Sequence, residues 1–291
     1  MTRMFGAVEG GGTKFLCALG ESSGRVLART EIPTTTPSET LARVIDFFAA
    51  QGIPHSVGVA MFGPLNLSRG TTLKTPKAAW NDVAVAATLE DALGVRVALD
   101  TDVNAAALAE WTDGAGQECD PLVYITVGTG VGGGLLVGGE PVHGLLHPEM
   151  GHLLVPRYVD STGVADSWPG ACPFHGACVE GVASGSAIQA RTGKSAKQLD
   201  ASAEAWAPVV DALAHLVVTT ILVASPQRVV MGGGVMNTQG LRAQVATRAQ
   251  DLLRGYVQAA ALTEDFEHYL VAPRSADAGL RGAFALAMRC T

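Results

Sequence analysis

The sequence lacks three features that define membrane, secreted and nucleic-acid-binding proteins. Its longest apolar run, residues 209–224, is interrupted by Asp211 and His215 and is too short to span a bilayer, so we expect a buried helix there. Residues 1–12 contain no long apolar core flanked by basic residues, so we expect no secretory signal. Lys and Arg form no cluster and the formal net charge is −7, which argues against a nucleic-acid surface. We therefore expect neither a membrane nor a nucleic acid among its partners.

Cysteine is also scarce, with 5 in 291 residues. Without a secretory signal, these thiols indicate a reducing compartment rather than a disulfide framework, and we expect a cytoplasmic protein. A hydrophobic content of 48% with only 16% charged residues describes a globular chain that can form a large core. Because 291 residues exceed the usual size of one domain, two domains are expected.

Strand-like and helix-like segments alternate along the chain, which indicates an α/β fold with a mixed or parallel sheet covered on both faces. The chain opens with a strand (residues 4–8), a glycine turn and a second strand (15–19). Residues 122–127, 128–130 and 131–137 repeat this pattern. The repeat predicts a small N-terminal α/β domain, 1–110, and a larger C-terminal one, 111–275. The final helix, about 276–291, is expected to return to the first domain.

Three glycine turns, each directly after an apolar strand, give the first indication of function. Glycine lets backbone N–H groups approach an anion closely, and neighbouring Thr and Lys side chains add a hydroxyl or a charge. A single turn of this kind is equally typical of a plain β-turn, but corresponding turns in two halves favour a phosphate clamp between two domains. The residues predicted to bind phosphate groups are Gly10, Gly11, Gly12, Thr13, Lys14, Thr129, Gly130, Gly232, Gly233 and Gly234.

The longer strings around these turns resemble one family. The residues that carry the resemblance are Val8–Lys14, Asp102–Ala107 and Val127–Gly134. They are similar to the ROK family (repressors, uncharacterised reading frames and sugar kinases), over essentially the whole chain. The resemblance implies a two-domain actin-like fold, as in the hexokinase and heat-shock-protein superfamily, with a cleft between the domains. It also implies a homodimer that uses ATP and Mg²⁺ to phosphorylate a small sugar.

Phosphoryl transfer to a hydroxyl needs positioning, charge stabilisation and a carboxylate that accepts the proton. Asp100 and Asp102 both follow a predicted strand (95–99) and precede an alanine-rich helix. Local sequence slightly favours an N-cap role for Asp102, which is common for Asp at such a position. The resemblance instead makes Asp102 the general base. It also implies that Glu9, where many relatives have Asp, acts indirectly on Mg²⁺, and Thr101 stands where many relatives have a sugar-binding Asn.

Four of the twelve Cys and His residues fall between positions 152 and 178. Cys172-x-x-His175-x-x-Cys178 has the spacing of metal ligands, and His152 can complete a tetrahedron. Two thiolates and two imidazoles favour Zn²⁺, and a complete set of four ligands predicts a structural site rather than one that activates water. The alternative is an accidental cluster of buried cysteines and surface histidines.

Carboxylates flank both ends of this metal-binding segment. Glu149 precedes His152, and Glu180 follows Cys178. Taken alone, Glu149 and Glu180 are most simply solvated surface charges. The resemblance implies that Glu149, His152 and Glu180 contact the sugar hydroxyls, with zinc acting indirectly by holding His152 and Glu180 in place. His143 and His147 are expected to form loop hydrogen bonds rather than to bind the metal.

Residues 147–152 and 172–181 together are most similar to the short bacterial zinc-containing fructokinases of the family. This similarity implies conversion of D-fructose to fructose 6-phosphate, and mannose or glucose remain open. A transcriptional repressor would need a DNA-binding module, for which no room is expected before the strand that begins near Met4. A non-catalytic sugar-binding regulator is a further alternative, and the presence of Asp102 counts against it.

Overall fold

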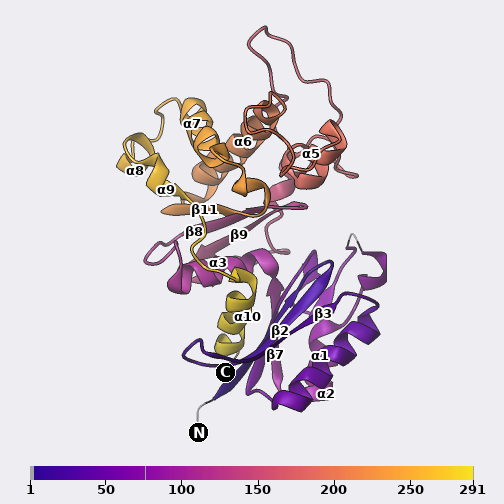
Figure 1. Ribbon diagram of the computed structural model, residues 1–291. Coiled ribbons are helices and arrows are strands. Elements are labelled where there is room, and N and C mark those ends of the chain that lie inside the picture. The colour runs from indigo at the N-terminus through magenta and orange to yellow at the C-terminus, as the bar shows by residue number, and fades with distance from the viewer. Residues whose placement is uncertain (1–2, 76, 291) are drawn as a thin grey trace. The chain divides into compact units, whose positions relative to one another are not determined.

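The computed structural model describes residues 3–75 and 77–290. Its contacts divide the chain into two units, each with its own sheet and hydrophobic core (Figure 1). The first unit contains the chain up to Gly114, the segment Glu140–His147 and the C-terminal segment from Ser275. The second unit contains Ala115–Gly139 and Pro148–Arg274.

The two sheets share one pattern of strand order and direction. In the first unit the order is β3-β2-β1-β4-β7, with β1 antiparallel to β2 and parallel to β4, and β4 parallel to β7. In the second unit β9-β8-β11-β12 has the same arrangement, a hairpin followed by two parallel strands. The strands of the first unit are β1 (Met4–Gly10), β2 (Lys14–Glu21), β3 (Val26–Pro33), β4 (Ser56–Met61) and β7 (Arg96–Thr101), with the short β5 (Leu65–Asn66), β6 (Thr71–Thr72) and β10 (Glu140–Pro141). Those of the second are β8 (Leu122–Val127), β9 (Val131–Val137), β11 (Arg228–Gly232) and β12 (Leu270–Val271).

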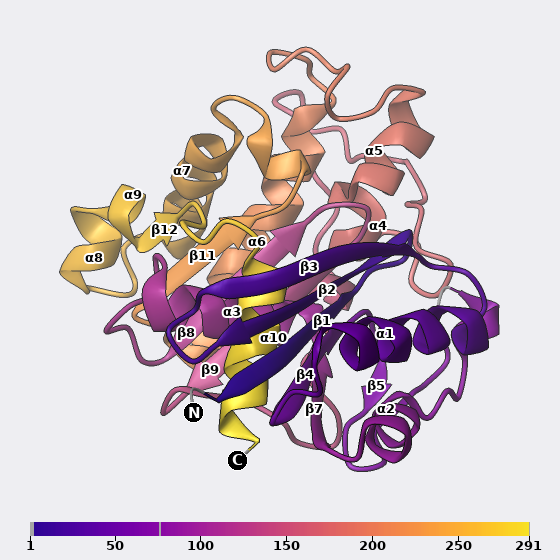
Figure 2. The same cartoon turned by 60° about the horizontal axis from the view of Figure 1, so that its bottom comes forward.

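Helices cover both faces of the first sheet. Successive strand residues point to opposite faces of a sheet. Gly6 lies against Phe48 of α1. The next residue, Ala7, pairs with Gly58, which lies against Ala283 of α10 on the other face. A Cβ on Gly58 would come 1.8 Å from the Ala283 carbonyl oxygen, so this glycine is required by the close approach of α10. Figure 2 shows α10, in yellow, crossing these strands beside α3. The helices α1 and α2 lie together, apart from α3 and α10. The helices of this unit are α1 (Pro37–Gln51), α2 (Val85–Leu93), α3 (Asp102–Asp113), α10 (Ala278–Arg289) and the 3-10 turn η1 (Ala78–Trp80).

The second core lies between its sheet and two long helices, α6 (Trp206–Ala224) and α7 (Leu241–Leu253) (Figure 1). Alternate residues of β8, Val123, Ile125 and Val127, point into it. The remaining helical elements are η2 (Met150–His152), α4 (Val179–Ala183), α5 (Gly185–Thr192), η3 (Val235–Asn237), α8 (Ala260–Thr263) and α9 (Phe266–Tyr269).

The apolar segment of the sequence forms most of α6. Within the described residues, α6 is the single helix whose length and composition would allow it to cross a membrane, and 61% of its apolar window is buried inside the protein. Leu213, Leu216 and Val217 are completely buried in the second core. The helix is therefore apolar because it packs on a sheet, as the sequence predicted.

Candidate functional site

Asp102 is the first residue of α3, directly after β7, and it does not cap that helix. The N-cap is Thr101, whose Oγ1 accepts a hydrogen bond from the backbone N–H of Asn104 at 3.2 Å. The side chain of Asp102 accepts the N–H of Val103 at 2.9 Å and is partly exposed. The structural role that the local sequence favoured for Asp102 is therefore wrong, because the preceding hydroxyl performs it.

Asp100 is enclosed by hydrogen-bond donors. Its side chain is buried, and Oδ1 accepts from the N–H of Thr101 (2.7 Å) and from Nδ2 of Asn104 (2.8 Å). Oδ2 lies 3.0 Å from Nε2 of His143, which comes from the segment Glu140–His147. A carboxylate with these partners orders the β7–α3 turn, and it is a poorer base than the more accessible Asp102.

The Asp100–His143 pair gives a testable pH dependence. The hydrogen bond to Asp100 raises the pKa of His143 above its ordinary value. The pair therefore stabilises the fold fully below about pH 6.5, and this contribution is lost as the pH rises through the raised pKa. Because the His143 side chain is 40% exposed, we expect at most about 1 kcal/mol. His143→Gln should lower the melting temperature by about 2–4 °C at pH 5.5 and by less at pH 8.5.

Thermal unfolding between pH 5.5 and pH 8.5 measures the difference in melting temperature between the wild type and the His143 variant. His55→Gln is the matched control, because His55 is an exposed histidine with no ion pair among the described residues. An equal loss of stability at both ends of the pH range in the His143 variant would contradict the assignment.

The first predicted phosphate turn joins β1 to β2. Gly12 and Thr13 are exposed, and the turn is fixed by the Gly11 N–H bond to the Lys14 carbonyl (2.9 Å) and by the Thr34 hydroxyl bond to the Gly11 carbonyl (2.7 Å). The charge of Lys14 is neutralised by an ion pair, because its Nζ lies 2.6 Å from the carboxylate of Glu31 on the neighbouring strand β3.

Glu9, the residue expected near Mg²⁺, lies on β1 at the start of α10. Its carboxylate occupies the space above Gly279, where a Cβ would come 2.5 Å from it, and it accepts the backbone N–H of Leu280. Burial raises the pKa of Glu9, and the nearby Asp277 raises it further. The hydrogen bond from Leu280 to Glu9 is thus structural, because it pairs a backbone N–H in the first turn of α10.

In the second unit, the other two glycine turns lie together. Gly233 has a φ of 95° and packs on the backbone of Val127, which precedes the turn of Gly128, Thr129 and Gly130. A side chain at Gly233 would both clash with that strand and require a strained backbone. The structure therefore brings Gly128–Gly130 and Gly232–Gly234 to one edge of the second sheet.

Glu180 connects this turn to the predicted sugar-binding residues. Its Oε2 accepts the N–H of Val131 at 3.0 Å and fills the space that a side chain at Gly130 would need. Its Oε1 lies 4.0 Å from Nε2 of His152. Glu149 is exposed and precedes η2, the turn that carries His152. Glu180 is thus an ordered residue at the base of α4, not a freely solvated charge.

The four residues with metal-ligand spacing form one cluster. The ligand atoms of His152, Cys172, His175 and Cys178 all lie within 4.8 Å of one another. Nδ1 of His152 is 3.7 Å from both sulfurs, and Nδ1 of His175 is 3.7 Å from the sulfur of Cys172. Sulfur and nitrogen ligands at normal zinc distances around a tetrahedral centre are about 3.6 Å apart. The donor set and its dimensions therefore fit Zn²⁺.

The surroundings of Cys178 do not by themselves stabilise a thiolate. Burial is the main cause that raises the pKa of the Cys178 thiol to about 11, and the neighbouring Cys172 sulfur raises it as well. A metal ion offsets this cost, because it binds the thiolate form. His152 has its Nδ1 in the cluster and its Nε2 toward Glu180, so one imidazole joins the metal-binding residues to the carboxylate.

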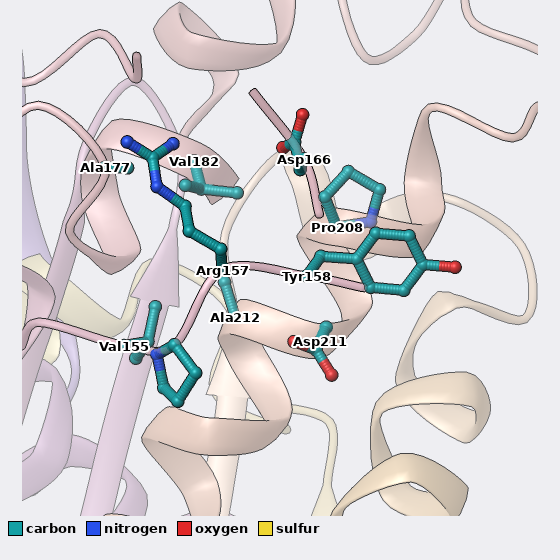
Figure 3. A pocket seen from close by; sticks show the side chains of 10 residues that line it. Val155, Arg157, Tyr158, Asp166, Ala177, Val182, Pro208, Asp211 and Ala212 are labelled. Carbon is teal, nitrogen blue, oxygen red and sulfur yellow. The ribbon is translucent and has the colours of Figure 1, made fainter. Parts of the chain in front are cut away.

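The second unit also contains a pocket that none of these residues lines (Figure 3). It forms where the loop of Arg157 and Tyr158 passes Pro208, Asp211 and Ala212 of α6, with further lining from Val155, Pro156, Asp166, Ala177 and Val182. Its two carboxylates are already paired, Asp211 with Arg248 (2.7 Å) and Asp166 with Arg191 (2.6 Å). The pocket contains none of the predicted site residues, and the guanidinium of Arg157 in its lining donates a hydrogen bond to the Trp168 carbonyl.

Comparison with known proteins identifies the family of the chain. A family model described as the ROK family matches residues 5–290. The chain belongs to the ROK family. A fructokinase of Zymomonas mobilis is 43% identical over 98% of this ROK protein and 97% of its own length. A putative fructokinase of Bacillus subtilis is 38% identical over 98% and 95% of the two chains, whereas a glucokinase of Streptomyces coelicolor is 30% identical over 51% of this chain.

Among solved structures, a ROK hexokinase from Thermus thermophilus superposes with a TM-score of 0.79 and 25% identity, covering 98% of both chains. This likeness confirms the predicted two-domain actin-like α/β class for the present ROK protein. The sequence did not indicate that Lys77 lies beside the first glycine turn, because no local motif distinguishes it from a surface lysine.

Proposed function

We propose that this ROK protein transfers the γ-phosphoryl group of ATP to D-fructose and forms fructose 6-phosphate. The observation that carries the proposal is the 43% identity to a fructokinase over nearly the whole of both chains. Four further relatives named fructokinase or putative fructokinase, 32–38% identical over 88–98% of this chain, support the same substrate.

The chemistry assigns one role to each group of residues. Asp102, at the start of α3, accepts the proton of the attacking sugar hydroxyl as general base. Glu149, His152 and Glu180 bind sugar hydroxyls, since carboxylates accept hydrogen bonds from several hydroxyls at once. The three glycine turns, with Thr13, Lys14 and Thr129, bind the phosphates of ATP through backbone N–H groups, hydroxyls and a positive charge.

Two metal ions belong to this proposal. His152, Cys172, His175 and Cys178 would hold Zn²⁺, which when bound supplies a structural crosslink between η2 and the loop before α4. Mg²⁺ would enter with ATP, and Glu9 would act on it through water, because its carboxylate is already bonded to α10. We also propose a cytoplasmic homodimer, as the family resemblance implies.

A hexose screen tests the substrate. ADP formation is coupled to NADH oxidation, and kcat/KM is measured for fructose, mannose, glucose and galactose. We expect fructose to exceed each of the others by about 10- to 150-fold, which one or two contacts to a hydroxyl can supply. A higher kcat/KM for mannose or glucose would assign the enzyme to that sugar. Sugar binding without turnover of any hexose would support a non-catalytic regulator.

A further inference from the structure

Lys77 lies beside the first glycine turn although it is distant in sequence. A Cβ placed on Gly12 would come 3.3 Å from Cε of Lys77, the carbon that carries the ammonium group. The absence of a side chain at Gly12 therefore leaves room for the end of the lysine. Gly12 and its neighbour Thr13 are exposed, so the ammonium group lies at an accessible face of the turn.

The backbone of Lys77 is fixed by several hydrogen bonds. The Thr75 hydroxyl donates to the Lys77 carbonyl (2.8 Å) and accepts the Lys77 N–H (3.2 Å). The N–H of Trp80 also donates to that carbonyl, at 2.8 Å. The N–H of Thr75 is held by Oδ1 of Asn81 at 2.8 Å. The lysine therefore projects from the N-cap position of η1, where its backbone N–H and carbonyl are both hydrogen-bonded.

This turn is attached to the strand that leaves the glycine turn. Trp80 is buried, its ring centroid is 5.2 Å from that of Phe15, and its Nε1 donates to the Thr35 carbonyl at 3.0 Å. Phe15 is the second residue of β2 and follows Lys14 directly. The packing of Trp80 on Phe15 thus fixes the base of Lys77 relative to residues 10–13.

The two lysines near this turn differ in whether their ammonium groups form an ion pair. Lys14 is paired with Glu31 at 2.6 Å. Lys77 has no ion pair within residues 3–75 and 77–290, so its charge is not neutralised by a described carboxylate. An ammonium group beside a turn of backbone N–H groups is suited to a phosphate, which it binds as a point charge.

We propose that Lys77, rather than Lys14, supplies the main positive charge at the first glycine turn and binds the γ-phosphoryl group of ATP during transfer. This inference rests on the proposed kinase function and adds a residue to its phosphate site. Phosphoryl transfer depends on groups that offset the charge of the transferred phosphate. The rigid support by Thr75 and Trp80 reduces the reorganisation that the lysine needs when charge develops.

The test compares Lys77→Met with Lys77→Arg, Lys14→Met and the matched control Lys74→Met. Lys74 is an exposed lysine on the same segment. We expect Lys77→Met to lower kcat by about 100-fold, since loss of one group that stabilises transition-state charge costs about 10²–10³-fold. Lys77→Arg should keep part of the activity, Lys14→Met should lose much less than Lys77→Met, and Lys74→Met should behave as the wild type.

Calorimetric binding of ADP and of a non-hydrolysable ATP analogue separates the γ-phosphate from the rest of the nucleotide. Lys77→Met should weaken binding of the analogue by about tenfold or more and change the Kd of ADP by less than about threefold. Retained ADP binding also shows that the variant is folded. An equal loss for both nucleotides, a change in the KM of fructose alone, or a larger effect of Lys14→Met would overturn the proposal.

The binding measurement also separates this inference from the proposed function. If the wild type phosphorylated no hexose but Lys77→Met lost the analogue selectively, the kinase assignment would fail while the phosphate contact would stand. If the wild type were an active fructokinase and Lys77→Met matched it in kcat and in both nucleotide affinities, the inference about Lys77 would fail alone.

Discussion

Replacing Asp102 with Asn is expected to lower kcat for sugar phosphorylation by about 10³-fold. A positioned general base contributes about 10²–10⁴-fold, and the amide cannot accept the hydroxyl proton. The fold should be unaffected, because Asn has the same shape and its carbonyl oxygen can still accept the N–H of Val103. Thr101, not Asp102, caps α3, so no cap is lost. Steady-state kinetics with fructose and thermal unfolding measure the two effects separately.

Thr101→Ala is the comparison that reveals a purely structural contribution of this turn. It removes the N-cap of α3 and should cost about 1 kcal/mol of unfolding free energy. The Asp102→Asn variant should therefore lose turnover at nearly constant melting temperature, whereas Thr101→Ala should lose stability. Full turnover in Asp102→Asn would show that Asp102 is not the base and would strengthen the case for Asp100 or for a non-catalytic protein.

Loss of the metal cluster is expected to have the second largest effect. Cys178→Ser should reduce the bound zinc from about one equivalent per chain to near zero, because a complete four-ligand site loses one thiolate. A ligand present at about 1,000 times its Kd adds about 4 kcal/mol to the folded state. The melting temperature should therefore fall by about 8–16 °C. Elemental analysis and thermal unfolding check the two outcomes.

The same variant should weaken fructose binding, because His152 joins the cluster to Glu180. Nδ1 of this imidazole faces both sulfurs, and Nε2 lies 4.0 Å from the carboxylate that is bonded to Val131. We expect the Kd of fructose to rise by about tenfold or more, as when a supporting group around a metal site is removed. Cys290→Ser is the matched control, since Cys290 is a free thiol outside the cluster. Unchanged stability and fructose affinity after removal of zinc by a chelator would contradict this link.

The fold could be predicted largely because its signals are local. The strand, glycine turn and strand at residues 4–19 and 122–137 became the hairpins β1–β2 and β8–β9, which occupy equivalent places in the two sheets. The apolar run at 209–224 became the buried part of α6. Each pattern depends on alternation or periodicity within a few residues, which dictates which side of an element is buried.

The metal-binding residues were also readable, and for the same reason. Cys172, His175 and Cys178 lie within one short loop, so their spacing alone limits how far apart their ligand atoms can be. His152 comes from a separate turn, η2, and the contact of that turn with β9 depends on Gly151, where a Cβ would come 1.9 Å from the Val131 carbonyl. The sequence thus predicted all four members of the cluster, and the packing of η2 on β9 is what places His152 beside the other three.

Only the tertiary structure decided which charged side chains are held by neighbouring groups of the protein and which are accessible to a substrate. Asp100 and Asp102 look equivalent in the sequence, yet Asp100 is enclosed by Thr101, Asn104 and His143. Lys14 belongs to the glycine motif but pairs with Glu31, while Lys77 comes from another segment and lies at Gly12. The sequence by itself determined the two-fold strand pattern, the family and the types of residue at the site. The partners of each charge depended on contacts between segments distant along the chain, which packing alone sets.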